Sequence, residues 1–135
     1  MRYIAYSAIL FTTFLVPCAF AETKYSAYHH ACISKARDDV SIRDCNGEEL
    51  AKQSARLNEA YKFAIAALPD EKKEKLKIDQ ALWLKFRNAD CELYYSLTGG
   101  TIDLLNGSGC ELSMTRDRAD SLEWFADNGG EYGGE

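Results

Sequence analysis

Apolar residues recur every three or four positions over 50–68, the spacing of one face of an α-helix. Asn46 followed by Glu49 has the form of a capping box, which predicts the start of this helix nearby. Pro69 predicts its end, because the residue before a proline is pushed out of the α conformation. The apolar stripe consists of Leu50, Leu57, Tyr61, Ile65 and Leu68.

A second helix is predicted directly after Pro69, with Asp70 as its cap and its end near Leu97. Gly99 and Gly100 follow, and glycine favours a helix exit because it readily adopts the left-handed conformation. The short connection at Pro69 predicts that the two long helices form an antiparallel hairpin. The residues expected to face inward are Leu76, Trp83, Phe86, Leu93 and Leu97.

Two further helices are predicted, a short one over 28–38 and a longer one over 110–126. The glycine-rich segment 98–109 is expected to be a loop with one helical turn at 102–105. No stretch alternates between apolar and polar residues as a strand would. The fold class is therefore predicted as all-α, a small helical bundle built on a long antiparallel helical hairpin with two disulfides. The third long helix should present Met114, Leu122 and Phe125 to the core.

The N-terminus has the order of an export signal. Arg2 precedes an apolar run over 3–16, and the small residues Ala19 and Ala21 occupy the positions that a signal peptidase requires. The run is shorter than the roughly 20 residues of a membrane span. We therefore expect a signal peptide over 1–21 and a periplasmic or secreted protein with no membrane span after its removal.

The remaining chain is expected to form one helical domain over 22–126 and a flexible acidic tail over 127–135. Cys18 leaves a lipid anchor open as an alternative. Pro17 before it fits lipoprotein processing poorly, because that processing requires a small residue there.

The cysteines predict a disulfide framework. Removal of Cys18 with the signal would leave four cysteines. An even number of cysteines in a small exported chain predicts disulfides, and four cysteines allow three possible pairings. We expect the pairs Cys32–Cys45 and Cys91–Cys110, because each loop is short and each pair flanks an expected break in helix. A thiol nucleophile or metal site is disfavoured, since an oxidising compartment consumes thiols and no CxxC pair is present.

Charge separates the chain into unlike parts. The net charge is −5 over 135 residues, which argues against nucleic-acid binding because no basic patch is available for phosphates. Residues 91–135 carry nine acidic side chains against Arg116 and Arg118. Such a segment can attract a cationic partner, while solubility and an acidic tail explain it equally well.

Candidate catalytic groups have simpler explanations. His29 and His30 are adjacent, so on a helix they point about 100° apart and do not converge on one metal ion; we expect them to be solvated and idle. Capping and ion pairing account for the acidic residues that could form a glycosidase pair, which are Glu48, Glu49, Asp90 and Glu92. We therefore expect no enzyme activity, cofactor or metal.

A polar cluster interleaved with a tryptophan is more unusual. Four residues of the second helix are spaced three or four positions apart, so they lie on one face of that helix. Arg118 of the last predicted helix is expected to join this cluster. Buried polar groups must find partners, so we interpret the cluster as a hydrogen-bonded lock between helices, with ligand binding as the alternative. The cluster comprises Gln80, Trp83, Arg87, Asp90 and Arg118.

These residues resemble the LprI-type lysozyme-inhibitor family. The pattern is a cysteine, L-N-x-x-Y, Q-x-x-W-x-x-x-R-x-x-x-C, a glycine pair, and a last cysteine before T-x-x-R, and it spans roughly 30–125. The segment 106–109, Asn-Gly-Ser-Gly, departs from the continuous helix expected there. The matching residues are Cys45, Leu57, Asn58, Tyr61, Gln80, Trp83, Arg87, Cys91, Gly99, Gly100, Cys110, Thr115 and Arg118.

The resemblance implies a non-enzymatic exported domain that binds a cationic protein, with lysozyme as the candidate, and occludes its substrate cleft. The expected partner-binding residues lie in the Cys91–Cys110 loop, where a disulfide lowers the cost of ordering exposed apolar groups. They are Ile102, Asp103, Leu104 and Leu105. Leu104 and Leu105 could equally fold back onto the core. The alternative function is an envelope interaction module whose partner is an unrelated protein.

Overall fold

The computed structural model describes residues 25–129, which form four α-helices and no strand. They are α1 (Ala27–Lys35), α2 (Asp39–Ala67), α3 (Asp70–Tyr94) and α4 (Ile102–Asn128). The predicted all-α bundle is confirmed, and so are both disulfides, Cys32–Cys45 and Cys91–Cys110. The predicted signal peptide, Cys18 and the tail beyond residue 129 lie outside the described residues.

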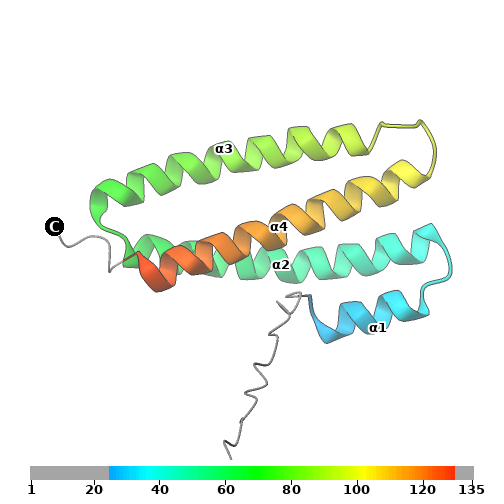
Figure 1. Ribbon diagram of the computed structural model, residues 1–135, viewed down its shortest axis with the longest axis horizontal. Coiled ribbons are helices and arrows are strands. Elements are labelled where there is room, and N and C mark those ends of the chain that lie inside the picture. The colour runs from blue at the N-terminus through cyan, green and yellow to red at the C-terminus, as the bar shows by residue number, and fades with distance from the viewer. Residues whose placement is uncertain (1–24, 130–135) are drawn as a thin grey trace, which may run out of the picture.

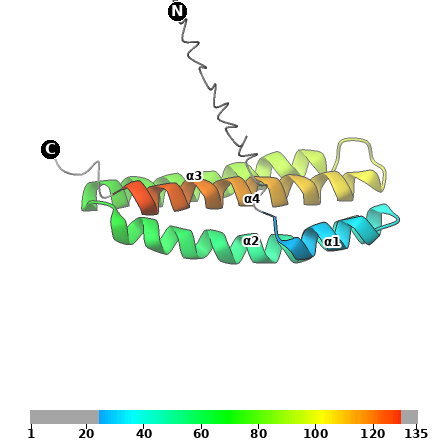
Figure 2. The same cartoon turned by 60° about the horizontal axis from the view of Figure 1, so that its bottom comes forward.

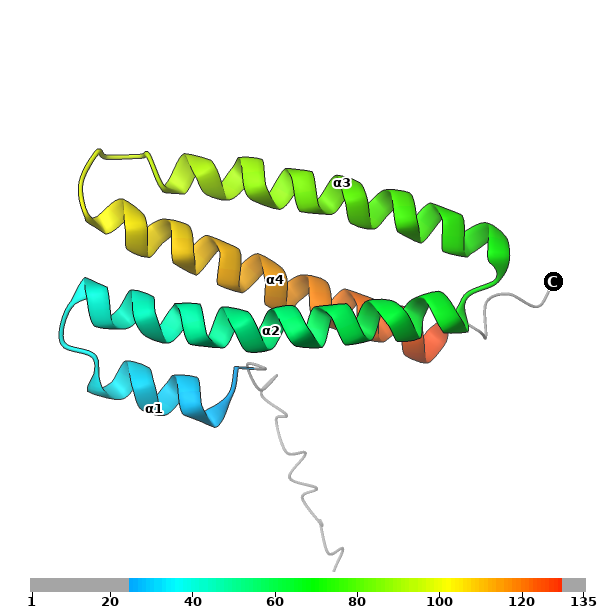
Figure 3. The same cartoon turned by 180° about the vertical axis from the view of Figure 1, so that it is seen from behind.

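The last helix is the central one. Figures 1 and 3 show α4 between α2 and α3, while α1 lies against the N-terminal part of α2. Figure 2 shows α1 and α2 in one layer and α3 and α4 in the other. None of the helices within residues 25–129 has an apolar stretch long enough to cross a membrane.

The core lies mainly between α2 and α4. Alanines on both helices are buried there, and such small side chains let the two backbones approach closely. Leu57 and Leu122 fill the space beside them, and α3 contributes Leu76. The partly buried residues packed around this cluster include Tyr61, Ile65, Leu68, Trp83 and Phe125, in agreement with the predicted stripes.

The start of α2 corrects one prediction. Its cap is Asp38, whose carboxylate accepts a hydrogen bond from the Ser41 backbone at 2.8 Å, while the Ser41 hydroxyl accepts one from the Asp38 backbone at 3.2 Å. This capping box lies upstream of Asn46, which is buried inside the helix and is not a cap. Because Asp38 requires extended backbone before α2, α1 ends at Lys35 and not at Asp38.

The predicted break at Pro69 is confirmed, but Pro69 itself is the cap of α3. Asp70 is instead the first helical residue, and its carboxylate pairs with Lys73 Nζ at 2.9 Å. The helix ends at Tyr94, short of the expected Leu97. Gly99 has φ 73°, the left-handed conformation expected of it, in the loop between α3 and α4.

The expected loop over 98–109 is wrong beyond residue 101. α4 begins at Ile102 and continues through both glycines of the Asn-Gly-Ser-Gly segment. Packing explains Gly107, because the ring of Tyr95 lies where a Cβ would be. At the other end α4 reaches Asn128, two residues beyond the predicted 126.

Gly107→Ala is therefore expected to lower the free energy of unfolding by about 1–3 kcal/mol, since the methyl group would overlap the Tyr95 ring. Denaturant unfolding measures the change. Gly109→Ala is the matched control, because a Cβ there meets nothing within 4 Å. Its expected effect is a gain of up to about 1 kcal/mol from helix propensity. Equal losses in both variants would contradict this role for Gly107.

The inward side of α3 also differs from the prediction. Phe86, Leu93 and Leu97 are about 60% exposed, although their spacing indicated a core position. The face of α3 turned toward α4 carries the polar residues Gln80 and Arg87 among its apolar side chains. Helix α3 therefore has two apolar stripes on opposite sides, and only the one with Leu76 reaches the core.

Candidate functional site

The end of the α3–α4 hairpin is a short loop, residues 95–101, held by covalent and polar links. The Cys91–Cys110 disulfide joins the last turns of α3 to α4, with 5.5 Å between the two Cα atoms. The thioether of Met114 lies within 3.8 Å of both sulfur atoms. The two helix ends that flank the loop are therefore held at a fixed separation.

Asp103 fixes the loop from inside. Its carboxylate accepts hydrogen bonds from the backbone N–H groups of Thr98 and Gly99, at 2.9 and 2.8 Å, and from the Thr98 hydroxyl at 2.9 Å. Burial would raise the pKa of Asp103, but these hydrogen bonds outweigh it and lower the pKa below the ordinary 3.8. The carboxylate is therefore charged at neutral pH, and its hydrogen bonds are made to groups of the loop itself.

Apolar side chains are exposed around this fixed loop. Leu97 is 61% exposed, and the three others, 40–44% exposed, lie at the end of α3 and the start of α4. We name this surface the tip patch; it consists of Tyr94, Leu97, Ile102 and Leu104. A group of exposed apolar residues on a rigid support is typical of a protein interaction site.

The structure divides the predicted partner-binding residues. Ile102 and Leu104 belong to the tip patch, whereas Leu105 is half-buried and Asp103 is 2% exposed. Asp103 therefore cannot contact a partner while it holds the loop. Tyr94 and Leu97 were not predicted, because the helical spacing of Leu97 indicated a core position.

The predicted polar cluster links α3 to α4. Arg118 Nε donates to Gln80 Oε1 at 2.7 Å, and Arg118 Nη2 donates to Asp79 at 2.5 Å. Arg87 Nη1 donates to the Thr115 hydroxyl at 3.1 Å. Both guanidinium groups lie over the ring of Trp83, at 5.2 and 5.7 Å from its centroid. Each arginine thus receives a polar partner and an aromatic face at the helix interface.

Asp90 does not join this cluster. Its carboxylate lies 4.0 Å from Cys110 Sγ, and it lines a surface pocket of about 320 Å³ together with Tyr94. The pocket adjoins the tip patch through Tyr94, so Asp90 lies beside that surface and not in the polar cluster.

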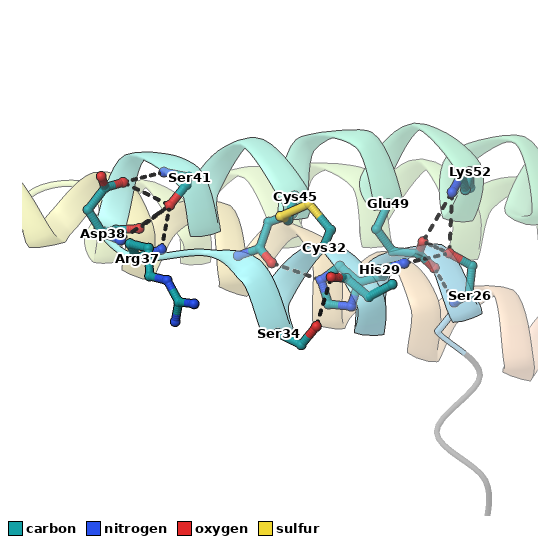
Figure 4. Close-up of a disulfide and its surroundings, with 12 residues drawn as sticks. Ser26, His29, Cys32, Ser34, Arg37, Asp38, Ser41, Cys45, Glu49 and Lys52 are labelled. Carbon is teal, nitrogen blue, oxygen red and sulfur yellow. Dashed lines mark hydrogen bonds and ion pairs between the residues drawn. A yellow bond between two sulfur atoms is a disulfide. The ribbon is translucent and has the colours of Figure 1, made fainter.

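A second polar network holds α1 against α2 (Figure 4). Glu49 is fully buried and accepts hydrogen bonds from the Ser26 backbone at 2.9 Å, the Ser26 hydroxyl at 2.5 Å and the Gln53 amide at 2.9 Å. The ammonium group of Lys52 lies 3.9 Å away. Glu49 was interpreted as a capping residue, yet its carboxylate is the centre of this network.

His29 belongs to the same interface and is not the solvated residue that we expected. His29 is 8% exposed, and its Nε2 lies 3.1 Å from Asn46 Oδ1. The Asn46 amide in turn donates to the Ser108 hydroxyl on α4 at 3.4 Å. This chain of side chains connects three helices. Nothing in its sequence spacing predicted the connection, because the residues lie 17 and 62 positions apart.

These arrangements are structural. Both disulfides consume their cysteines, and Glu49 is surrounded by donors from the protein itself. Within residues 25–129 no group of three or more His, Cys, Asp or Glu side chains is placed to hold a metal ion. The tip patch is therefore the best candidate for a functional surface, and the function that it suits is binding.

The acidic charge of the last helix is largely used inside the protein. Arg56 on α2 donates to Glu123 at 2.6 Å and also binds Asp120. Arg116 pairs with Asp117 at 2.6 Å. The negative field around α4 is therefore weaker than the count of its carboxylates suggests.

Comparison with known families and proteins identifies the chain. The family model described as lysozyme inhibitor LprI matches residues 32–122. This range includes all four described cysteines and the motifs Q-x-x-W-x-x-x-R-x-x-x-C and T-x-x-R. The chain belongs to the LprI lysozyme-inhibitor family. The predicted resemblance is therefore confirmed.

The LprI-family chain is also similar to an uncharacterized protein of Rhizobium meliloti (strain 1021). The two are 27% identical over 103 residues, which cover 66% of this chain and 74% of that protein. No solved structure gives a significant match. The family match thus carries the link to lysozyme inhibition, and the relative adds no activity of its own.

Proposed function

We propose that this LprI-family protein is exported and inhibits lysozyme by placing its tip patch in or across the substrate cleft, without chemistry of its own. Family membership supports the class of activity. The observation that supports the site is the pairing of exposed apolar residues with a loop that is already ordered by Asp103 and the Cys91–Cys110 disulfide. Both disulfides agree with an oxidising location outside the cytosol.

Pre-organisation is the physical reason for choosing this surface. A loop that is ordered before binding loses little conformational entropy in the complex, so more of the contact energy appears as affinity. The tip is the end of the α3–α4 hairpin and lies at the same end of the bundle as the α1–α2 connection (Figure 1); we expect its side chains to enter the concave substrate cleft. Apolar and aromatic anchors such as Leu104 and Tyr94 are suited to fill it.

Charge supports this proposal in a secondary way. The whole chain has a net charge of −5, so it attracts a cationic enzyme at long range. Since Arg56 and Arg116 neutralise several carboxylates of α4, we expect this attraction to affect the rate of association more than the lifetime of the complex. Inhibition should therefore weaken only moderately as salt rises.

Leu104→Asp is expected to raise the inhibition constant for lysozyme about tenfold or more, because it places a charge among the apolar contacts of the tip patch. The measurement is a lysozyme activity assay with the mature protein at low and high salt. Phe63→Asp is the matched control: Phe63 is 59% exposed on α2, near the end of the bundle opposite the tip, and its replacement should leave inhibition unchanged.

Two results would contradict parts of the proposal. Equal weakening by both variants would remove the tip patch as the site. Unchanged lysozyme turnover at micromolar excess of the wild-type protein would remove the activity itself. In that case a specific partner recovered from envelope extract would favour the alternative function, an interaction module with an unrelated partner.

A further inference from the structure

Helix α3 presents an apolar stripe to solvent along its outer side, away from α4. Leu82 and Phe86 are each 60% exposed and Leu93 is 63% exposed. Ala89 lies between them and is also exposed. We name these four residues the α3 stripe. The stripe is separate from the core, and α3 lies at the outer edge of the bundle (Figures 1 and 3).

The spacing of the α3 stripe is that of a coiled-coil seam. Its positions are 82, 86, 89 and 93, and the alternating steps of four and three give two heptads with apolar d and a positions. At about 100° per residue they fall within one narrow arc, on the side opposite Gln80 and Arg87. The residues that contact α4 and those of the stripe therefore belong to opposite faces of one helix.

The exposed area is large for so small a protein. Three side chains that each keep about three-fifths of their surface, together with Ile78 and Ala89 beside them, expose on the order of 400–500 Å² of apolar area. A standard interface takes about 800 Å² from each partner. The α3 stripe with its polar rim is therefore close to the size that a specific, moderately stable contact requires.

The charges beside the stripe indicate what covers it. Lys85 and Glu92 both occupy g positions, on the same flank and seven residues apart, and both are exposed. The ion pairs within residues 25–129 join other side chains and include neither Lys85 nor Glu92. In an antiparallel pair of coiled helices, the g positions of one helix face those of the other. A second α3 running in the opposite direction would thus bring each Lys85 to a Glu92.

The same antiparallel register also fits the apolar residues by size. In a register that opposes positions summing to 175, Leu82 faces Leu93 of the partner in two layers, and Phe86 faces Ala89 of the partner in the other two. Each large ring is then matched by a small residue, and each leucine by a leucine. One register therefore satisfies both the packing and the charges, which is a property of a surface that recognises itself.

We propose that the protein forms a two-fold symmetric dimer through the α3 stripe, with the two α3 helices packed antiparallel. Lys85 of one protomer pairs with Glu92 of its partner, and the reverse pair forms by symmetry. The α3 stripe lies along the side of the bundle and contains no residue of the tip patch. The dimer thus goes beyond the proposed inhibition, and either can fail without the other.

Analytical ultracentrifugation of the mature, disulfide-bonded protein tests the dimer. We expect a monomer–dimer equilibrium with a Kd below about 100 µM. Leu82→Asp should raise the Kd at least tenfold, whereas the equally exposed Phe63→Asp should leave it unchanged. Circular dichroism should show the same helix content in all variants, since the replaced side chains are about 60% exposed.

The charge pair tests the register. Lys85→Glu alone should weaken the dimer, because each new glutamate would face Glu92 of the partner. The double variant Lys85→Glu/Glu92→Lys should restore the wild-type Kd. A wild-type protein that stays monomeric up to about 1 mM would overturn the proposal. So would a Lys85→Glu dimer as strong as the wild type, or a double variant no stronger than the single one.

Discussion

Replacing Glu49 with leucine is expected to lower the free energy of unfolding by about 3 kcal/mol. The carboxylate is fully buried, and its removal leaves the Ser26 backbone N–H, the Ser26 hydroxyl and the Gln53 amide facing an apolar side chain. Each buried donor without an acceptor costs about 1–3 kcal/mol, partly offset because Ser26 lies near solvent. Denaturant unfolding at neutral pH measures the loss.

Two variants separate this effect from a general cost of substitution. Glu49→Gln keeps the shape and one acceptor oxygen, so we expect roughly half the loss. Glu59→Leu introduces the same side chain at an exposed position of the same helix and should change stability by no more than about 0.5 kcal/mol. A Glu49→Leu variant as stable as Glu59→Leu would show that the network does not hold α1 in place.

The pH dependence of stability gives an independent measurement of the same carboxylate. Burial would raise the pKa of Glu49, but hydrogen bonds from the Ser26 hydroxyl and the Gln53 amide outweigh it, so the folded-state pKa lies below 4.5. The stabilisation is therefore fully present above pH 4.5 and is lost as the pH falls through the folded-state pKa. The stability difference between the wild type and Glu49→Gln should narrow on acidification, while Asp103, present in both, cancels in the comparison.

Removal of the Cys91–Cys110 disulfide, with both residues changed to alanine, is expected to cost about 3 kcal/mol of stability. It should also weaken lysozyme inhibition at least tenfold. Without the disulfide the ends of α3 and α4 can separate, and ordering the tip patch then consumes part of the binding free energy. Unfolding experiments and the lysozyme assay measure the two effects on the same preparation.

The other disulfide is the matched control. Cys32–Cys45 closes a comparable loop between α1 and α2, so its removal should cost a similar amount of stability. It does not hold the α3–α4 loop, and inhibition by the folded variant should equal that of the wild type. Equal loss of inhibition in both double variants would indicate that the disulfides act through global stability alone.

The sequence was most informative where a local chemical rule decides the structure. Pro69 ends α2 because its ring excludes the α conformation from Leu68, and the structure confirms this. The even number of cysteines and their short separations were sufficient for both disulfide pairs. The family motifs were sufficient for the family.

The sequence was misleading where packing decides between local alternatives. Asn46 has the form of a cap, but Asp38 with Ser41 begins the helix earlier. Gly107 has the form of a helix breaker, but the ring of Tyr95 needs the space that its missing side chain leaves. In both cases the residue that decides the structure, Asp38 or Tyr95, lies outside the local sequence motif.

The candidate site could be predicted only in part. Exposed leucines next to a disulfide indicated the position of the tip, and Leu104 is exposed there. Asp103 was expected to offer its carboxylate to a partner, yet this carboxylate accepts hydrogen bonds from the backbone of the loop itself. The apolar spacing of Phe86 and Leu93 indicated burial, and sequence periodicity cannot distinguish a core from a surface that another protein covers.

The central position of α4 has a consequence for how the molecule is made. α2 and α3 both pack mainly against this helix, although they precede it in the chain. When the chain is synthesised, or passes through a pore with its N-terminal end first, α2 and α3 remain only partly ordered until α4 emerges. Cys32 and Cys45 can meet early within the α1–α2 hairpin, whereas stable closure of the bundle requires nearly the complete chain. Truncation within α4 should therefore abolish folding altogether, and not simply trim one end.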